Sequence, residues 1–126
     1  MFEKIVELGI LFDFYGKLLS ENQYTVVELY YIHDLSLSEI GEELGITRQG
    51  VYDSLKRAEN NLYDFENNLG LVEKFKNVSN EVNNILKYVK VIVKDAEDLN
   101  NQEIVNNAKA IKTLAEKIIE DNQEVT

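Results

Sequence analysis

The sequence predicts an all-α protein that contains a helix-turn-helix, with a packing helix before it and a helical hairpin after it. Three observations support this fold class. The 126 residues include no proline, the residue that most strongly breaks helix interiors. Apolar residues recur at alternating steps of three and four along most of the chain. A helix-start signal stands on each side of Gly45, which is suited to a sharp turn between two helices.

The first predicted helix runs from about Phe2 to Leu19. One apolar stripe at helical spacing contains Ile5, Leu8, Phe12, Tyr15 and Leu19, and a second set contains Val6, Ile10, Leu11, Phe14 and Leu18. A helix that is apolar on so many sides is expected to be buried on more than one of them. One side can face the rest of the domain, and we expect the other to contact an identical subunit in a homodimer.

Two capping boxes mark the starts of the next two helices. The segments Ser20–Gln23 and Ser36–Glu39 both place a serine three residues before a glutamine or glutamate. The first of these helices is expected to end near Ile32. The second is short and is expected to end near Leu44, where Gly45 can adopt the left-handed conformation of a C′ residue.

A long helix is expected to follow, with Thr47 as its N-cap and Gly70 just past its end. Its apolar positions are Val51, Leu55, Ala58, Leu62, Phe65 and Leu69. The alternation then continues through Leu71, Phe75, Val78, Val82, Ile85, Val89, Ile92, Ala96 and Leu99. A heptad seam of this length is typical of coiled-coil-like packing.

A later seam is one residue out of phase with the first. It contains Ile104, Ala108, Ile111, Ala115 and Ile118. The turn-prone pair Asn100–Asn101 lies at the break, so the last helix is expected to fold back on the one before it. The seam residues can pack within the chain or against a second subunit. We divide the chain into a helix-turn-helix domain, residues 1–70, and a hairpin, residues 71–126, and expect them to form one compact unit.

In the stretch from Leu35 to Leu62, each apolar position has an expected packing role. The inward positions are Leu37, Ile40 and Leu44 on the first helix, Ile46 filling the corner, and Val51 and Leu55 on the second helix. Gly41 is small where the two helices approach each other. This pattern resembles the helix-turn-helix of sigma-factor region 4. That resemblance implies that the second helix enters the DNA major groove.

A closer resemblance is to the YlxM-like family of Gram-positive bacteria. It is carried by Leu11–Leu19 (LFDFYGKLL), Glu28–Tyr31 (ELYY), Thr47–Asp53 (TRQGVYD), Lys56, Arg57 and Glu59. It covers roughly the first 75 residues, and beyond Asn77 the hairpin looks longer than the family pattern. Tyr24 stands where a basic residue is expected. The resemblance implies a small helix-turn-helix protein, encoded beside components of the signal recognition particle, with a regulatory or accessory role and no catalytic activity.

The outward face of the long helix predicts a DNA-binding surface. With Val51 and Leu55 facing inward, the outward positions are Arg48, Gln49, Tyr52, Lys56 and Arg57. Arginine and glutamine can hydrogen-bond guanine and adenine edges, and lysine can bind a phosphate. We therefore expect these five residues to contact DNA in a transcription regulator.

The charge of the chain favours a different kind of partner. The formal net charge is −10, whereas proteins that bind nucleic acid are usually basic. Residues 20–62 carry eight acidic and three basic side chains, and Asp53 would repel phosphate. The alternative prediction is therefore an adaptor that binds a protein or a ribonucleoprotein and reuses the helix-turn-helix scaffold without specific DNA binding.

Nothing in the sequence predicts an enzyme, a metal site or a cofactor. The chain has no cysteine, and a lone His33 provides neither a catalytic dyad nor a metal cluster. Adjacent acids such as Glu42 and Glu43 point in different directions on a helix. The charged start of the sequence lacks a signal-peptide layout, and no apolar run could span a bilayer. We therefore expect a cytoplasmic protein without membrane contact.

Overall fold

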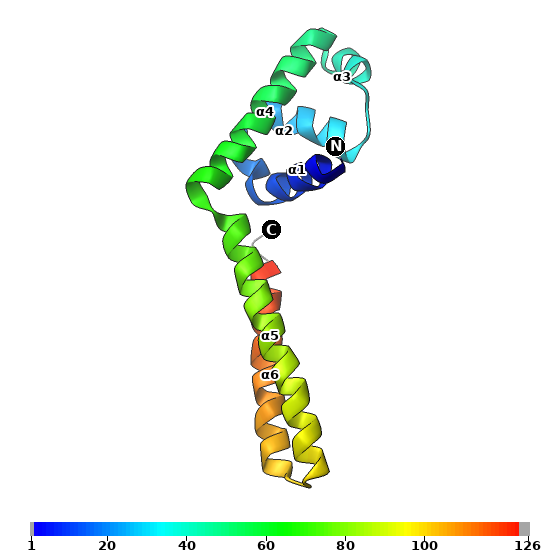
Figure 1. Cartoon of the computed structure of the whole chain (residues 1–126). Helices are drawn as coiled ribbons and strands as arrows, with labels where there is room; N and C mark the ends of the chain where they lie inside the picture. The colour runs from blue at the N-terminus through cyan, green and yellow to red at the C-terminus, as the bar shows by residue number, and fades with distance from the viewer. Residues whose placement is uncertain (1, 124–126) are drawn as a thin grey trace. The chain divides into compact units, whose positions relative to one another are not determined.

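The computed structural model describes residues 2–123, and its elements are helical, which confirms the all-α prediction (Figure 1). The helices are α1 (Phe2–Tyr15), α2 (Glu21–Val27), α3 (Leu37–Leu44), α4 (Arg48–Leu69), α5 (Leu71–Asp98) and α6 (Gln102–Gln123). The chain divides into two compact units, Met1–Val72 and Glu73–Thr126. The prediction that both parts pack as one compact unit stays a prediction.

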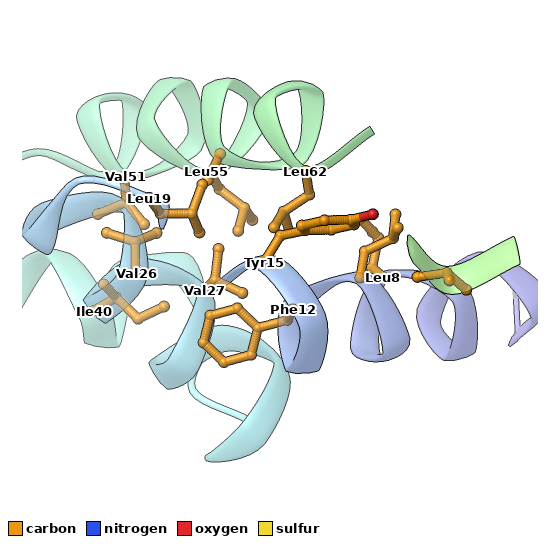
Figure 2. Close-up of a cluster of buried hydrophobic side chains, with 13 residues drawn as sticks. Leu8, Phe12, Tyr15, Leu19, Val26, Val27, Ile40, Val51, Leu55 and Leu62 are labelled. Atoms are coloured by element: carbon orange, nitrogen blue, oxygen red, sulfur yellow. The ribbon is translucent and has the colours of Figure 1, made fainter. Parts of the chain in front are cut away.

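The core of the first unit gathers apolar side chains from α1, α2, α3 and α4 (Figure 2). Its buried members are Leu8, Leu11, Phe12, Tyr15, Leu19, Val26, Val27, Ile40, Val51, Leu55, Ala58, Leu62 and Val72. Burial of this many apolar side chains is the main stabilising term of such a unit. The expected stripe is therefore confirmed from Leu8 onward. The helix itself ends earlier than the predicted Leu19, because Gly16–Leu18 form a 3-10 turn and Leu19 is extended.

The first turn of α1 differs from the prediction. Ile5 is 48% exposed because it borders an open groove and not the core. Of the second apolar set, Leu11 is buried, whereas Val6 and Leu18 are exposed. The first helix thus retains some apolar surface, but less than its sequence pattern indicated.

The segment after α1 begins as expected and then departs from regular α-helix. The hydroxyl oxygen of Ser20 accepts from the N–H of Gln23 at 3.2 Å, whereas the side-chain oxygen of Gln23 accepts from Asn61 at 3.1 Å. After α2 the chain forms one π-helical turn, Glu28–Ile32. Such a turn inserts an extra residue per turn and changes the direction of the side chains that follow. The sequence pattern had indicated a continuous helix to Ile32.

The helix-turn-helix follows the predicted local signals. At the start of α3 the N–H of Glu39 donates to the Ser36 hydroxyl, and the N–H of Ser36 donates to the Glu39 carboxylate, both at 3.1 Å. Gly45 ends α3 with a φ of 71°, the left-handed region that glycine adopts without strain. Thr47 caps α4 by accepting from the N–H of Gly50 at 2.9 Å.

The close approach in the helix-turn-helix occurs at Gly41. A Cβ added to Gly41 would lie 2.7 Å from the carbonyl oxygen of Ile46, which is shorter than real contacts allow. The expectation that the Ile46 side chain fills the corner is wrong, because this side chain is 41% exposed. The backbone of Ile46 faces α3 instead, and the absence of a side chain at Gly41 makes room for it.

A hydrogen-bond network joins α1, α4 and the first residues of α5. Gly70 ends α4 with a φ of 62°, and α5 begins at the next residue. The Tyr15 hydroxyl donates to Glu66 Oε1 and accepts from the N–H of Leu71 at 3.0 Å. The same Glu66 oxygen accepts from the N–H of Val72 at 3.0 Å. The first amides of a helix have no intrahelical acceptor, so these contacts cap α5.

The second unit is an antiparallel hairpin of α5 and α6, which confirms the break predicted at the asparagine pair (Figure 1). Asn100 adopts a φ of 56°, and the side-chain oxygen of Asn101 accepts from the N–H of Ile104 at 3.2 Å. At the open end, the Asn122 amide donates to the Phe75 carbonyl oxygen and to the Ser79 hydroxyl, both at 3.3 Å.

The predicted hairpin seam is only partly correct. Val82, Val89, Ala96, Ala108 and Ala115 are buried as expected. The seam residues Ile85, Ile92, Leu99, Ile104, Ile111 and Ile118 are each more than 40% exposed. The physical reason is a rotation of each helix, since the contact passes through the residues next to these isoleucines, such as Leu86, Val93 and Val105.

Candidate nucleic-acid interface

The N-terminal half of α4 presents the residues predicted to contact DNA. Inward packing of Val51 and Leu55 fixes the rotation of this helix. Arg48, Gln49, Tyr52 and Arg57 are exposed, and Lys56 is partly exposed. The structure therefore places all five predicted residues at or near the surface of one helix end.

Several of these side chains interact with neighbours on the same helix. The Gln49 amide donates to Asp53 at 3.0 Å, which is one helical turn away. The Lys56 ammonium donates to Glu59 at 3.4 Å and lies 5.6 Å from the centre of the Tyr52 ring. DNA would have to compete with these contacts.

The two arginines of this face differ from Lys56 in their ion pairing. Within residues 2–123, neither Arg48 nor Arg57 forms an ion pair with an acidic side chain. Arg48 is the first residue of α4, where backbone amides also favour an anion. This end of the helix therefore combines a cation without an acidic partner and the positive end of the helix dipole.

Acidic side chains surround this end of α4. Glu39, Glu42 and Glu43 are exposed on α3, and Asp53 is exposed on α4 itself. The capping hydrogen bond from the Ser36 backbone lowers the pKa of Glu39, so this carboxylate stays charged to lower pH than usual. Like charges weaken phosphate binding unless salt screens them.

A buried carboxylate lies on the same helix, where the exposed face of Tyr52 and Lys56 meets the core. Glu59 is 5% exposed, and its Oε2 accepts from the Tyr31 hydroxyl at 2.6 Å. Its Oε1 lies 3.4 Å from the Lys56 ammonium and 3.8 Å from that of Lys4. These partners satisfy a charge that would otherwise be costly to bury.

The pKa values of the partner groups follow from this arrangement. Burial raises the pKa of Tyr31, and its hydrogen bond to the Glu59 carboxylate raises it further. The negative charge of Glu59 also raises the pKa of Lys56. Lys56 therefore serves the interior ion pair as well as the outer face, which makes it a poor choice for a clean test of DNA binding.

A groove of about 620 Å³ opens beside this cluster. Its lining comes from α1, the π-helical turn, the connection before α3, and α3 and α4 themselves, and it includes Ile5, Leu35, Leu37, Tyr52 and Glu59. The apolar pattern of the sequence did not indicate this groove. The available signal was the spacing of Glu59, four residues after the inward Leu55, which places it on the buried side of α4.

Two further observations concern the described part of the chain. Among residues 2–123, no three histidine, aspartate or glutamate side chains gather closely enough to hold a metal ion.

None of the helices in that range has the length and apolar character needed to cross a membrane.

Comparison with known proteins identifies the family. A family model described as "UPF0122: Putative helix-turn-helix protein, YlxM / p13 like" matches residues 2–124. The chain belongs to the UPF0122 family. The match covers the hairpin as well as the helix-turn-helix, so the expectation that the chain departs from the family after about Asn77 is wrong. The description names a helix-turn-helix family and not an enzyme family.

Curated relatives support the same assignment. A UPF0122 protein of Thermoanaerobacter sp. strain X514 is 48% identical over 85 residues, which is 68% of this chain and 73% of the relative. One from Acetivibrio thermocellus is 42% identical over 118 residues, 94% of this chain and 96% of the relative. One from Bacillus thuringiensis is 39% identical over 114 residues, 90% and 99% respectively. No solved structure matches the chain significantly.

Proposed function

We propose that this protein is a non-enzymatic, cytoplasmic helix-turn-helix regulator that binds DNA with the N-terminal half of α4. The main support is the exposed face of this helix. On it, Arg48 and Arg57 are exposed without acidic partners among the described residues. The resemblance to YlxM-like proteins supports a role in, or regulation of, the signal recognition particle pathway. Two cations give a shallow salt dependence, so binding is weak or conditional.

A fluorescence anisotropy titration with fragmented genomic DNA tests this proposal at low and near-physiological salt. The test variant is Arg48→Ala/Arg57→Ala. The control Lys87→Ala/Lys94→Ala removes the same charge from exposed positions of α5. We expect the test variant to lose binding and the control to retain it, because phosphate and base contacts come from α4. Equal binding by both variants, or no binding by the native chain at low salt, contradicts the proposal.

The second candidate function is an adaptor that binds a protein or ribonucleoprotein. The observation that favours it is the acidity of the first unit, since residues 1–72 carry thirteen acidic and five basic side chains. A basic protein surface, or a nucleic acid already covered by a basic protein, is electrostatically more complementary to this acidic unit than bare DNA. Titration of a labelled signal particle, reconstituted from its protein and RNA, distinguishes the two. Binding that the arginine variant retains supports the adaptor function.

A further inference from the structure

The hairpin has an unusual distribution of apolar side chains. Its buried apolar residues are Val82, Val89, Ala96, Val105, Ala108 and Ala115. The contact between α5 and α6 is thus made mainly by small side chains, which allow two helices to approach closely. Five of the six larger isoleucines of the two helices lie outside this contact. A contact whose fully buried residues are only valine and alanine buries little apolar surface for a unit of this length.

The exposed isoleucines lie on one flank of the hairpin. Ile85 and Ile92 on α5, and Ile104, Ile111 and Ile118 on α6, are between 41% and 46% exposed. Four of them stand one position before a buried or half-buried residue of the α5–α6 contact line, which are Leu86, Val93, Val105 and Ile119, and Ile111 lies one heptad after Ile104. Because the two helices are antiparallel, residues displaced in the same sequence direction lie on the same side of the pair. The five isoleucines therefore form one continuous apolar surface along the hairpin.

The opposite flank is polar. The positions that follow the buried residues Val82, Val89 and Ala96 are Asn83, Lys90 and Glu97. On α6 the positions after Ala108 and Ala115 are Lys109 and Glu116. A hairpin that stood alone in water would be expected to have two polar flanks. One apolar and one polar flank indicate that a further helical layer covers the isoleucines.

We propose that a second copy of this chain covers this surface, so that two hairpins form a four-helix bundle with an isoleucine core. The surface consists of Ile85, Tyr88, Ile92, Leu99, Ile104, Ile111, Leu114 and Ile118, which are all exposed. Their uncovered area is on the order of 800 Å², close to what each partner contributes to a stable dimer. Two-fold packing of identical hairpins places this surface against itself.

The charge of the hairpin supports an identical partner. Residues 73–126 carry ten acidic and eight basic side chains, so they are nearly neutral although the whole chain has a net charge of −10. Two copies of this segment therefore approach with little repulsion, whereas two copies of the acidic first unit repel each other. The dimer is independent of whether α4 binds DNA.

Sedimentation equilibrium of the full chain tests the proposal. We expect a mass of twice 14.5 kDa for the native chain and of one chain for Ile92→Glu/Ile111→Glu. The control Asn83→Glu/Asn106→Glu adds the same charge at exposed positions away from the isoleucine surface, and it should remain dimeric. A monomeric native chain, or a control that dissociates as fully as the test variant, overturns the proposal.

A second measurement covers the case in which the glutamate variant unfolds the hairpin. The chain has no cysteine, so a single introduced thiol gives an unambiguous cross-link. Under mild oxidation, Ile111→Cys should form a disulfide-linked dimer at least ten times faster than Lys109→Cys on the polar flank, because only the first lies at the proposed two-fold contact. Equal rates for both variants overturn the proposal without any need for dissociation.

Discussion

At the scale of single residues, Glu59 is a buried carboxylate whose charge is compensated by three neighbouring side chains. It accepts a hydrogen bond from Tyr31 and contacts the ammonium groups of Lys4 and Lys56. Removal of one partner from a buried charged group leaves the charge under-compensated, which costs more than the pair contributes. This cluster therefore joins α1, the π-helical turn and α4 through side-chain chemistry.

Replacement of Tyr31 with phenylalanine removes one hydrogen-bond donor and keeps the ring. We expect Tyr31→Phe to lower the free energy of unfolding by about 1–3 kcal/mol, because Glu59 stays buried with one partner fewer. Urea denaturation measures the change. The control is Tyr30→Phe, whose hydroxyl has no hydrogen-bond partner within residues 2–123 and whose ring also packs against the core. Equal losses for both variants would show that ring packing alone matters.

Alkaline pH provides a second test at the same residue. Burial, followed by the hydrogen bond to Glu59, raises the pKa of Tyr31 above the ordinary value of 10.0. The unfolded chain then releases this proton at a lower pH than the folded chain. Stability is therefore complete below pH 10 and falls as the pH rises toward the folded pKa. Tyrosinate absorbance should show at least one of the seven tyrosines titrating late. Simultaneous titration of all seven near pH 10 in the folded protein would contradict this.

At the scale of elements, short local signals define the ends of the helices and one steric requirement fixes the turn. Ser36, Gly45 and Thr47 act through hydrogen bonds and backbone conformation within a few residues of themselves. Gly41 acts across the turn, because the Ile46 carbonyl occupies the place of its missing side chain. The angle between α3 and α4, and thus the exposure of the face of α4, depends on this contact.

Gly41→Ala should therefore open the helix-turn-helix. We expect a loss of about 1–3 kcal/mol in the free energy of unfolding, because the added Cβ meets backbone that cannot move independently. Gly9→Ala is the matched change, since a Cβ at Gly9 has nothing within 4 Å. It should stabilise the protein by about 0.5–1 kcal/mol through the better helix propensity of alanine. Thermal unfolding followed by circular dichroism gives both values, and a neutral Gly41→Ala would refute the steric argument.

The start of α5 depends on a carboxylate from α4. Glu66→Gln keeps the size of the side chain and removes the charge that faces the first amides of α5. We expect a loss of about 0.5–1.5 kcal/mol, because a negative charge near a helix N-terminus is stabilising. Hydrogen exchange at Leu71 and Val72 should accelerate, since their N–H groups bond to this network. The exposed Glu81→Gln is the control, and faster exchange in both variants would point to a general effect of charge.

At the scale of the whole molecule, charge is divided unequally along the chain. The first unit carries thirteen acidic and five basic side chains, and the hairpin is nearly neutral. Self-repulsion of like charges destabilises a compact state. The acidity therefore reduces the stability of the helix-turn-helix unit.

Salt should accordingly stabilise the protein. Raising the ionic strength from about 10 mM to 0.15 M shortens the Debye length, and we expect Tm to rise by roughly 2–4 °C. Glu42→Lys/Glu43→Lys reduces the net negative charge of α3, so its Tm should respond less to salt. Differential scanning calorimetry in both buffers gives the comparison. A Tm that falls with salt would mean that the ion pairs of Glu59 outweigh the general repulsion.

The sequence by itself determined the class of fold, the starts of α2, α3 and α4, the ends of α3 and α4, and the position of the hairpin turn. These features depend on local chemistry: serine and threonine caps, glycine at positive φ, and an asparagine pair that ends α5. The outward position of Arg48, Gln49 and Arg57 followed from the helical period once Val51 was assigned to the core. Such signals act within a few residues, so they can be read without knowledge of distant contacts.

Only the tertiary structure decided which of two adjacent apolar rows is buried. Val82 and Ile85 both fit an alternation of three and four, and the rotation of α5 against α6 buries the first and exposes the second. The burial of Glu59 and the exposure of Ile46 likewise depend on which neighbour occupies the space beside them. Periodicity identifies an apolar face, but the shape of the packing partner determines which residues of that face leave water.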